Sequence, residues 1–358
     1  MAEIVLGVGT SHTPLLSLDP SLWETYALGD QRNPELAYPP NGWVLPWEQG
    51  KHQIPDAIKA KYEGSAPFAA QYERFQRALD TLADSLQAAE PDITIIVSDD
   101  QDEWLFEDNM PTFAVCWADS VPIIPRQFPS TMHPGIAHAI SAGYGDVELE
   151  VPVASKFGRY LIEHLIEHDF DVAHVRHLKS EYGGKVARRY PTPDGELQLE
   201  RETPPRPQGL PHGYSFVVKR LFRNQPRPIL PVLQNTCYPP NQPTSRRSFA
   251  FGRAVAQAVR EWDEPARVAV VASGGLSHFV VDEELDWTVL NGLLDKDAQA
   301  LSTLPRHRLH SATSESLNWV SLGGAMHDTG LQAELLDYVP VYRTPAATGG
   351  GWAFMRWQ

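Results

Sequence analysis

The chain has 358 residues, 42% hydrophobic and 10% aromatic, which is an ordinary composition for a globular protein that buries a large core. Its net charge of −15 argues against nucleic acid or an anionic membrane surface as the main partner. With two distant cysteines, Cys116 and Cys237, and no basic, apolar leader, we expect a cytoplasmic protein without a disulfide framework, a cysteine-based zinc site or a membrane span.

Apolar runs alternate with helical patterns along the chain. This alternation predicts an α/β fold with a central, mainly parallel sheet flanked by helices. The predicted strands are Ala2–Val8, Asp92–Ser98, Thr112–Val115, Val172–Val175, Ile229–Leu233 and Val268–Ser273. The predicted helices cover residues 68–90, 153–168 and 245–262, the last with Thr244 or Ser245 as N-cap. We expect a single catalytic domain over residues 1–358.

Two segments interrupt this pattern. Residues 17–66 are rich in proline, tryptophan and polar residues, and they form a long excursion suited to wall a pocket. Its tryptophans (Trp23, Trp43 and Trp47) fit an aromatic ligand and simple packing equally well. Residues 179–211 are predicted to form an exposed hairpin and a proline-rich connector. The histidines of residues 164–177 are interpreted as a solvated helix end and a half-exposed strand, not as a metal site.

Polar side chains follow several of the predicted strands. His12 follows the first strand, Asp99, Asp100 and Gln101 follow the second, and His278 follows "VVASGGLS". Ligands of open α/β sheets bind beyond the carboxyl ends of the strands, so these residues predict a site. Imidazole and carboxylate groups together suit a metal or acid–base centre. They leave open whether that centre is a non-haem iron oxygenase or a zinc or manganese hydrolase.

The sequence resembles the class III extradiol ring-cleavage dioxygenases, typified by the protocatechuate 4,5-dioxygenase β subunit. The resemblance runs from the first strand to the last residues of the chain. Its motifs, in order, are "GVGTSHTPLL", "DDQDEWLFEDNMPTFAV", "LPHGYSFVVKRLF", "QNTCYPPNQPTSRR", "VVASGGLSHFV", "SESLNWVSLGGAM" and "VYRTPAATGGGWAFMRW".

The resemblance implies an iron(II) enzyme that uses dioxygen to open the ring of a catechol- or gallate-type phenol beside its two hydroxyls. It implies that His12 and Glu315 are metal ligands. It makes His278 the acid–base residue at the substrate, and His212 a second catalytic histidine that stabilises reaction intermediates. A homodimer is the usual assembly for such cytoplasmic enzymes, although no motif here indicates one.

Gln101 departs from the family pattern, because it stands where the family has its second histidine ligand. In one explanation Gln101 binds the metal through its amide oxygen, oriented by Glu103, or else Asp99 or Asp100 takes that place. In another, His52 from the excursion supplies the ligand. In the third, the metal is lost or replaced. We take His12, Gln101 and Glu315 as the expected ligand set.

Two rival functions follow from this departure. The same pocket would suit a metal-dependent hydrolase or lyase that needs no dioxygen. The fold could also belong to a non-catalytic homologue that has lost its iron chemistry. In that case His12, His212, His278 and Glu315 would have no reason to converge in space.

Overall fold

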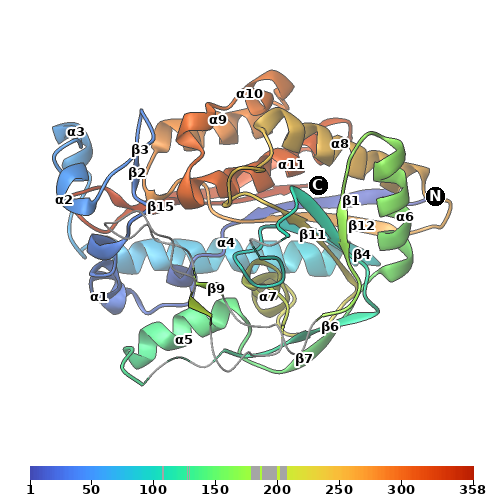
Figure 1. The fold of residues 1–358 in the computed structure, drawn as a ribbon, viewed down its shortest axis with the longest axis horizontal. Coiled ribbons are helices and arrows are strands. Elements are labelled where there is room, and N and C mark those ends of the chain that lie inside the picture. Colours follow the sequence, from blue (N-terminus) through green and yellow to red (C-terminus); the bar gives the residue numbers. More distant parts are fainter. Residues whose placement is uncertain (107–108, 127, 129, 179–185, 188–199, 202–207) are drawn as a thin grey trace.

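The computed structural model describes residues 1–106, 109–126, 128, 130–178, 186–187, 200–201 and 208–358 (Figure 1). Its centre is a nine-stranded sheet with the order β13-β15-β1-β12-β4-β11-β5-β8, in which β14 pairs with β15. These strands are β1 (Glu3–Thr10), β4 (Ile93–Ser98), β5 (Phe113–Cys116), β8 (Ala173–Val175), β11 (Ile229–Gln234), β12 (Arg267–Ser273), β13 (His278–Val280), β14 (Ala333–Tyr342) and β15 (Thr348–Trp357).

The four central strands, β1, β12, β4 and β11, run parallel. Every residue of β4 and β11 is buried, as expected for parallel strands with helices on both faces. Antiparallel pairs flank this centre, with β15 beside β1 and β5 beside β11. The predicted α/β class and all six predicted strands are therefore confirmed, with shifts of one or two residues at their ends.

Helices cover both faces of the sheet (Figure 1). On the upper face in that view lie α8 (Ser245–Glu261), α9 (Glu283–Leu294), α10 (Ala298–Ser302) and α11 (Ser316–His327). On the lower face lie α4 (Phe68–Ala89) and α7 (His212–Phe216), while α6 (Ser155–Glu167) packs near β5. The three predicted helices are confirmed, and the Thr244 hydroxyl caps α8 by accepting the Arg247 N–H. No helix in the described part of the chain is long and apolar enough to cross a membrane.

The 17–66 excursion folds into short elements that pack at one corner of the sheet. They are α1 (Trp23–Ala27), β2 (Ala37–Tyr38), β3 (Trp43–Val44), α2 (Trp47–Gly50) and α3 (Asp56–Lys59). A small apolar cluster joins this segment, through Leu36, Tyr38 and Ile54, to β13 and to Tyr342. The excursion therefore covers the strand that begins with His278.

Two further parts of the chain complete the fold. The hairpin β6 (Ser120–Ile123) and β7 (Leu149–Pro152) brackets α5 (Pro134–Gly143). Of the predicted 179–211 hairpin, the structure describes an antiparallel pair, β9 (Val186–Ala187) with β10 (Glu200–Arg201). Residues 208–211, at the end of the predicted connector, are described and lead into α7, and the rest of that prediction lies outside the described residues. The single-domain organisation stays a prediction.

A buried ion pair ties the excursion to the β14–β15 connection. The Arg343 guanidinium donates Nε–H to Asp30 Oδ2 at 3.0 Å and Nη2–H to Asp30 Oδ1 at 2.9 Å. The Thr348 hydroxyl also donates to Asp30, at 2.8 Å. Because both charged side chains are buried, each depends on the other for compensation.

We expect Asp30→Asn to lower the free energy of unfolding by about 3–5 kcal/mol, because Arg343 is left as an uncompensated buried charge. Chemical denaturation of the purified variant measures this loss. Asp328→Asn is the control, since its pair with Arg253 is exposed and should contribute about 1 kcal/mol or less. Similar losses in the two variants would contradict the expectation.

Candidate metal centre at the strand ends

The carboxyl ends of neighbouring parallel strands bring the candidate residues together. His12 lies two residues beyond β1, and Asp99 directly follows β4. The chain leaves β12 through Gly274 and Gly275 and re-enters the sheet at His278. Glu315 immediately precedes α11, which packs on β12 and β4. Residues more than 300 positions apart in the sequence thus meet at one edge of the sheet.

His12, Asp99 and Glu315 form a compact group of possible metal ligands. One ligand atom from each lies within 4.8 Å of the others, and all three side chains are buried. His12 Nε2 lies 3.4 Å from Glu315 Oε2. Gln101, the expected ligand, lies beside this group, with its amide nitrogen 2.9 Å from Asp99 Oδ2 and 3.1 Å from Glu315 Oε1.

The hydrogen bonds of His12 identify which of its nitrogens faces the centre unprotonated. The Ser273 hydroxyl donates its single hydrogen to the Gly213 carbonyl at 2.7 Å. It must therefore accept the hydrogen of His12 Nδ1, which lies 3.0 Å away. Burial lowers the pKa of His12 to about 3, despite the opposing charge of Glu315, so the ring is neutral and Nε2 offers a lone pair. Metal-binding histidines are commonly held in this way.

Asp99 and Glu315 place two buried carboxyl groups side by side, and a bound cation would favour the charged form of both. Burial, and then the neighbouring charge of Glu315, raise the pKa of Asp99 well above its usual range. Burial also acts to raise the pKa of Glu315, but His278 and His12 outweigh it and the pKa is lowered. A lone pair of His12 faces these oxygens, so the donor set fits a divalent metal ion.

His278 lies on the other side of Glu315. Its Nδ1 lies 2.9 Å from the Leu276 carbonyl, which can only accept, so Nδ1 carries a hydrogen. Its Nε2 lies 3.2 Å from Glu315 Oε1 and is the nitrogen that can exchange a proton within the site. Burial acts to lower the pKa of His278, but the attraction of Glu315 outweighs it and the pKa is raised.

His212 completes the cluster and has a carboxylate partner of its own. Its ring lies edge-on to that of His12, with centroids 4.7 Å apart. Its Nδ1 donates to Glu103 Oε2 at 2.8 Å, and Arg126 donates to the other oxygen of Glu103 at 3.2 Å. Burial acts to lower the pKa of His212, but Glu103 reverses this and raises the pKa to about 9, which favours an imidazolium.

The structure corrects the expected role of Glu103. The sequence places it as a partner that orients Gln101, whereas its carboxylate contacts His212 and Arg126 instead. The physical reason is direction: the loop after β4 turns between Gln101 and Glu103, and Asp102 adopts a positive φ of 56° there. Gln101 and Glu103, only two residues apart, therefore contact different neighbours.

Two other candidate ligands lie outside the group. Both oxygens of the Asp100 carboxylate accept backbone N–H groups, from Glu103 at 2.9 Å and from Trp104 at 2.8 Å, so they shape the loop. His52 is exposed, in the turn that follows α2. The sequence left both open as replacements for the missing histidine ligand, and the geometry places neither at the centre.

A second set of possible ligands lies near the ends of α6 and α8. It consists of His164, His168 and Glu261. The two imidazoles stack with centroids 3.9 Å apart and planes inclined by 19°, so their in-plane lone pairs do not converge on one point. His164 is buried, which corrects the expectation of a solvated helix end. This arrangement is better described as packing than as a metal site.

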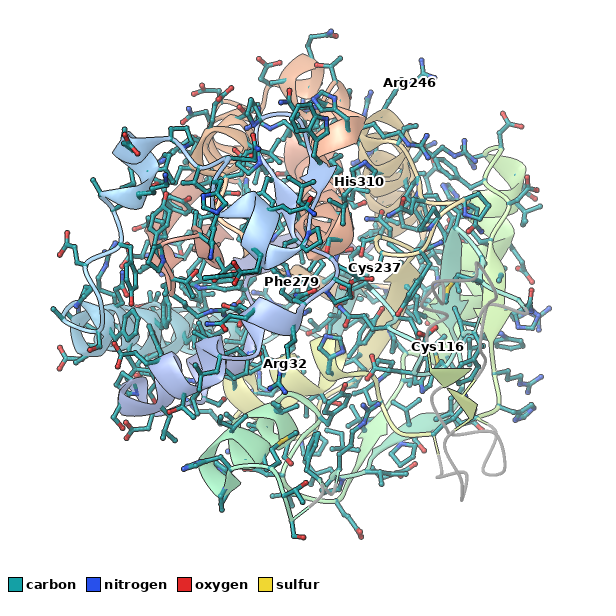
Figure 2. All side chains as sticks on the ribbon, turned by 60° about the vertical axis from the view of Figure 1, so that its left-hand side comes forward. Arg32, Cys116, Cys237, Arg246, Phe279 and His310 are labelled. Atoms are coloured by element: carbon teal, nitrogen blue, oxygen red, sulfur yellow. The ribbon has the colours of Figure 1, made fainter. Side chains whose placement is uncertain are left out.

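The tryptophans of the excursion and several other side chains lie outside the group of possible ligands. Arg246 is exposed and projects at the rim of the molecule, whereas Phe279, the neighbour of His278, lies centrally in the same view (Figure 2). Trp23 is buried against Phe68 and Phe75, which makes it a packing residue. Trp43 is 56% exposed and Trp47 joins the small apolar cluster under the excursion. Cys116 is buried and Cys237 is half-buried.

Comparisons with known proteins bear on the second half of the chain. Residues 206–351 match the family model described as the catalytic LigB subunit of aromatic ring-opening dioxygenase. Among solved structures, the uncharacterized protein JW3007 from Escherichia coli K12 shares 14% sequence identity, with a TM-score of 0.43 over 79% of this chain and 91% of that chain. Three of the site residues, His212, His278 and Glu315, therefore lie within the segment that matches the model of the catalytic LigB subunit of aromatic ring-opening dioxygenase.

Proposed function

We propose that this protein is a non-haem iron(II)-dependent extradiol dioxygenase, which opens the ring of a catechol- or gallate-type phenol beside its hydroxyls. One observation carries the proposal: an unprotonated His12 Nε2 faces Glu315 and Asp99 in a cluster of buried side chains, with His278 and His212 beside it. The convergence of these residues argues against a non-catalytic homologue. The family of residues 206–351 supplies the class of reaction.

Ferrous iron bound by His12 and the carboxylates would supply Lewis acidity for the diol oxygens and electrons for dioxygen. The protein residues then have separate tasks. His278 Nε2 takes the proton of a substrate hydroxyl and returns one as the ring opens, while its Nδ1–H stays fixed on Leu276. The His212 imidazolium, held by Glu103, supplies positive charge where negative charge develops on oxygen.

Oxygen consumption tests this function directly. Protein purified without oxygen and reconstituted with ferrous iron is mixed with catechol, protocatechuate or gallate in an oxygen-electrode cell, and absorbance is followed for the ring-opened product. We expect uptake of dioxygen in step with loss of the phenol, and no reaction under argon. Turnover under argon would indicate a hydrolase or lyase, and no turnover with any diphenol would contradict the proposal.

Glu103→Gln should reduce kcat/KM by about tenfold to hundredfold, the usual cost of losing a hydrogen bond between charged groups. The reason is the charge on His212: without the carboxylate its pKa falls, so the imidazolium is lost at lower pH. The alkaline limb of the pH–rate profile should therefore move to lower pH. Glu48→Gln, at an exposed acid that pairs with Lys51, is the control. An unmoved limb would show that the charge on His212 is not used.

A further inference from the structure

We infer that Asp99, and not Gln101, is the third protein ligand of the metal. The centre would then consist of one imidazole and two carboxylates, with Gln101 acting as a clamp that holds the carboxylates together. This inference rests on the metal centre of the proposed function. It differs from the expected set of His12, Gln101 and Glu315, and it concerns the one position where the chain departs from the family pattern.

The position of Asp99 is fixed by a chain of buried amides. Asn318 Nδ2 donates to Asp99 Oδ1 at 3.2 Å, and the side-chain oxygen of Asn318, Oδ1, accepts from Gln234 Nε2 at 3.3 Å. The Ser321 hydroxyl in turn donates to Gln234 Oε1 at 2.7 Å. All these side chains are buried. Carboxylate ligands are generally oriented by hydrogen bonds from neighbouring side chains, and this chain of hydrogen bonds orients Asp99.

Gln101, in the same cluster, is placed as a hydrogen-bond donor and not as a metal ligand. Its amide nitrogen lies 2.9 Å from Asp99 Oδ2 and 3.1 Å from Glu315 Oε1, so its two hydrogens serve one carboxylate each. If the amide were reversed, its oxygen would face two carboxylates and lose both hydrogen bonds. The carboxylates need a donor at this point, and an amide NH₂ group provides it without adding charge. Gln101 therefore holds two ligand side chains instead of being one.

Replacing one histidine ligand by Asp99 alters the net charge of the centre and the metal ions that it prefers. A divalent ion with two carboxylates and a neutral imidazole is formally uncharged, whereas two imidazoles and one carboxylate leave a net charge of +1. Oxygen ligands suit ferrous iron and manganese, and imidazole ligands raise the affinity for zinc and copper. We therefore infer a harder site than a centre with two histidines, one selective for oxygen-preferring divalent ions.

Cobalt(II) titration tests the assignment without substrate or oxygen. The metal-free chain is prepared as wild type, Asp99→Asn, Gln101→Ala and Asp100→Asn, and affinity and the visible ligand-field absorption are recorded for each. We expect Asp99→Asn to weaken binding by more than about a hundredfold and to change the absorption bands. Gln101→Ala, as the loss of a supporting hydrogen bond, should cost about tenfold to hundredfold and leave the band positions unchanged. Asp100→Asn is the matched control, since Asp100 is buried but binds backbone amides.

Each outcome decides the assignment. Changed bands in Gln101→Ala, or unchanged bands in Asp99→Asn, would overturn it, as would a wild type that binds no metal. Thermal unfolding of each metal-free variant shows whether it is folded. If Asp99→Asn does not fold, the spectra of Asp99→Ser and Gln101→Ala still decide which residue is the third ligand. A wild type that shows the expected pattern but consumes no diphenol would leave the ligand assignment standing and overturn the proposed reaction.

Discussion

Glu315→Gln is expected to abolish tight binding of a divalent ion and to lower turnover by about a thousandfold or more, because a Lewis-acid metal supplies several kcal/mol of transition-state stabilisation. Glu315 is central to the cluster: its Oε2 lies 3.4 Å from His12 Nε2, and its Oε1 lies 3.2 Å from His278 Nε2. The amide keeps the shape of the side chain but removes its charge and turns one acceptor into a donor. Metal content by mass spectrometry and oxygen uptake measure the two effects.

A surface acid provides the comparison for this variant. Glu73→Gln makes the same chemical change at a side chain that is 72% exposed on α4, so metal content and turnover should stay at wild-type values. The Gly275 N–H donates to Glu315 Oε2 at 2.7 Å, and the glutamine oxygen can still accept it, so the loop around the site should persist. Retained metal with lost turnover would show that Glu315 acts on substrate and not as a ligand.

The strand ends could be predicted from the sequence because the signal is local. Runs such as "ITIIVS" and "VAVVAS" predict buried parallel strands, and the polar residues that follow them fall at one edge of the sheet. His12, Asp99 and His278 were found in this way. Glu315 has no such signal, since it precedes a helix among serines, and it was found only through the resemblance.

Other features depend on contacts that no local pattern encodes. Glu103 and His212 are 109 positions apart, and Glu103 lies in the acidic run "DDQDE", which resembles a solvated turn although its carboxylate is buried. The sequence does not predict the β14–β15 hairpin, because β14 mixes charged residues with proline and β15 has three glycines directly after its first residue. These glycines are required by close packing: a Cβ at Gly351 would lie 1.9 Å from Asp286 Oδ2.

The placement of His278 is independent of its own side chain. The neighbouring Ser277 donates its backbone N–H and its hydroxyl to the buried Asp286, both at 2.7 Å. The backbone N–H of His278 donates to the Thr313 hydroxyl at 3.0 Å, and that hydroxyl donates to the His278 carbonyl at 2.7 Å. A substitution at His278 therefore changes the chemistry at Nε2 while the surrounding backbone stays in place.

For this reason His278→Gln should lower kcat by about 10²- to 10⁴-fold, the usual contribution of a general acid–base group, while metal content stays at the wild-type level. The glutamine amide can still form a hydrogen bond to Glu315, but it cannot take and return a proton. The limb of the pH–rate profile that reports this proton should disappear, which a purely structural role would not cause. His310→Gln, at an exposed histidine, is the control. A variant with near-normal kcat would assign the proton transfer to His212, and a variant without metal would make His278 part of the metal centre.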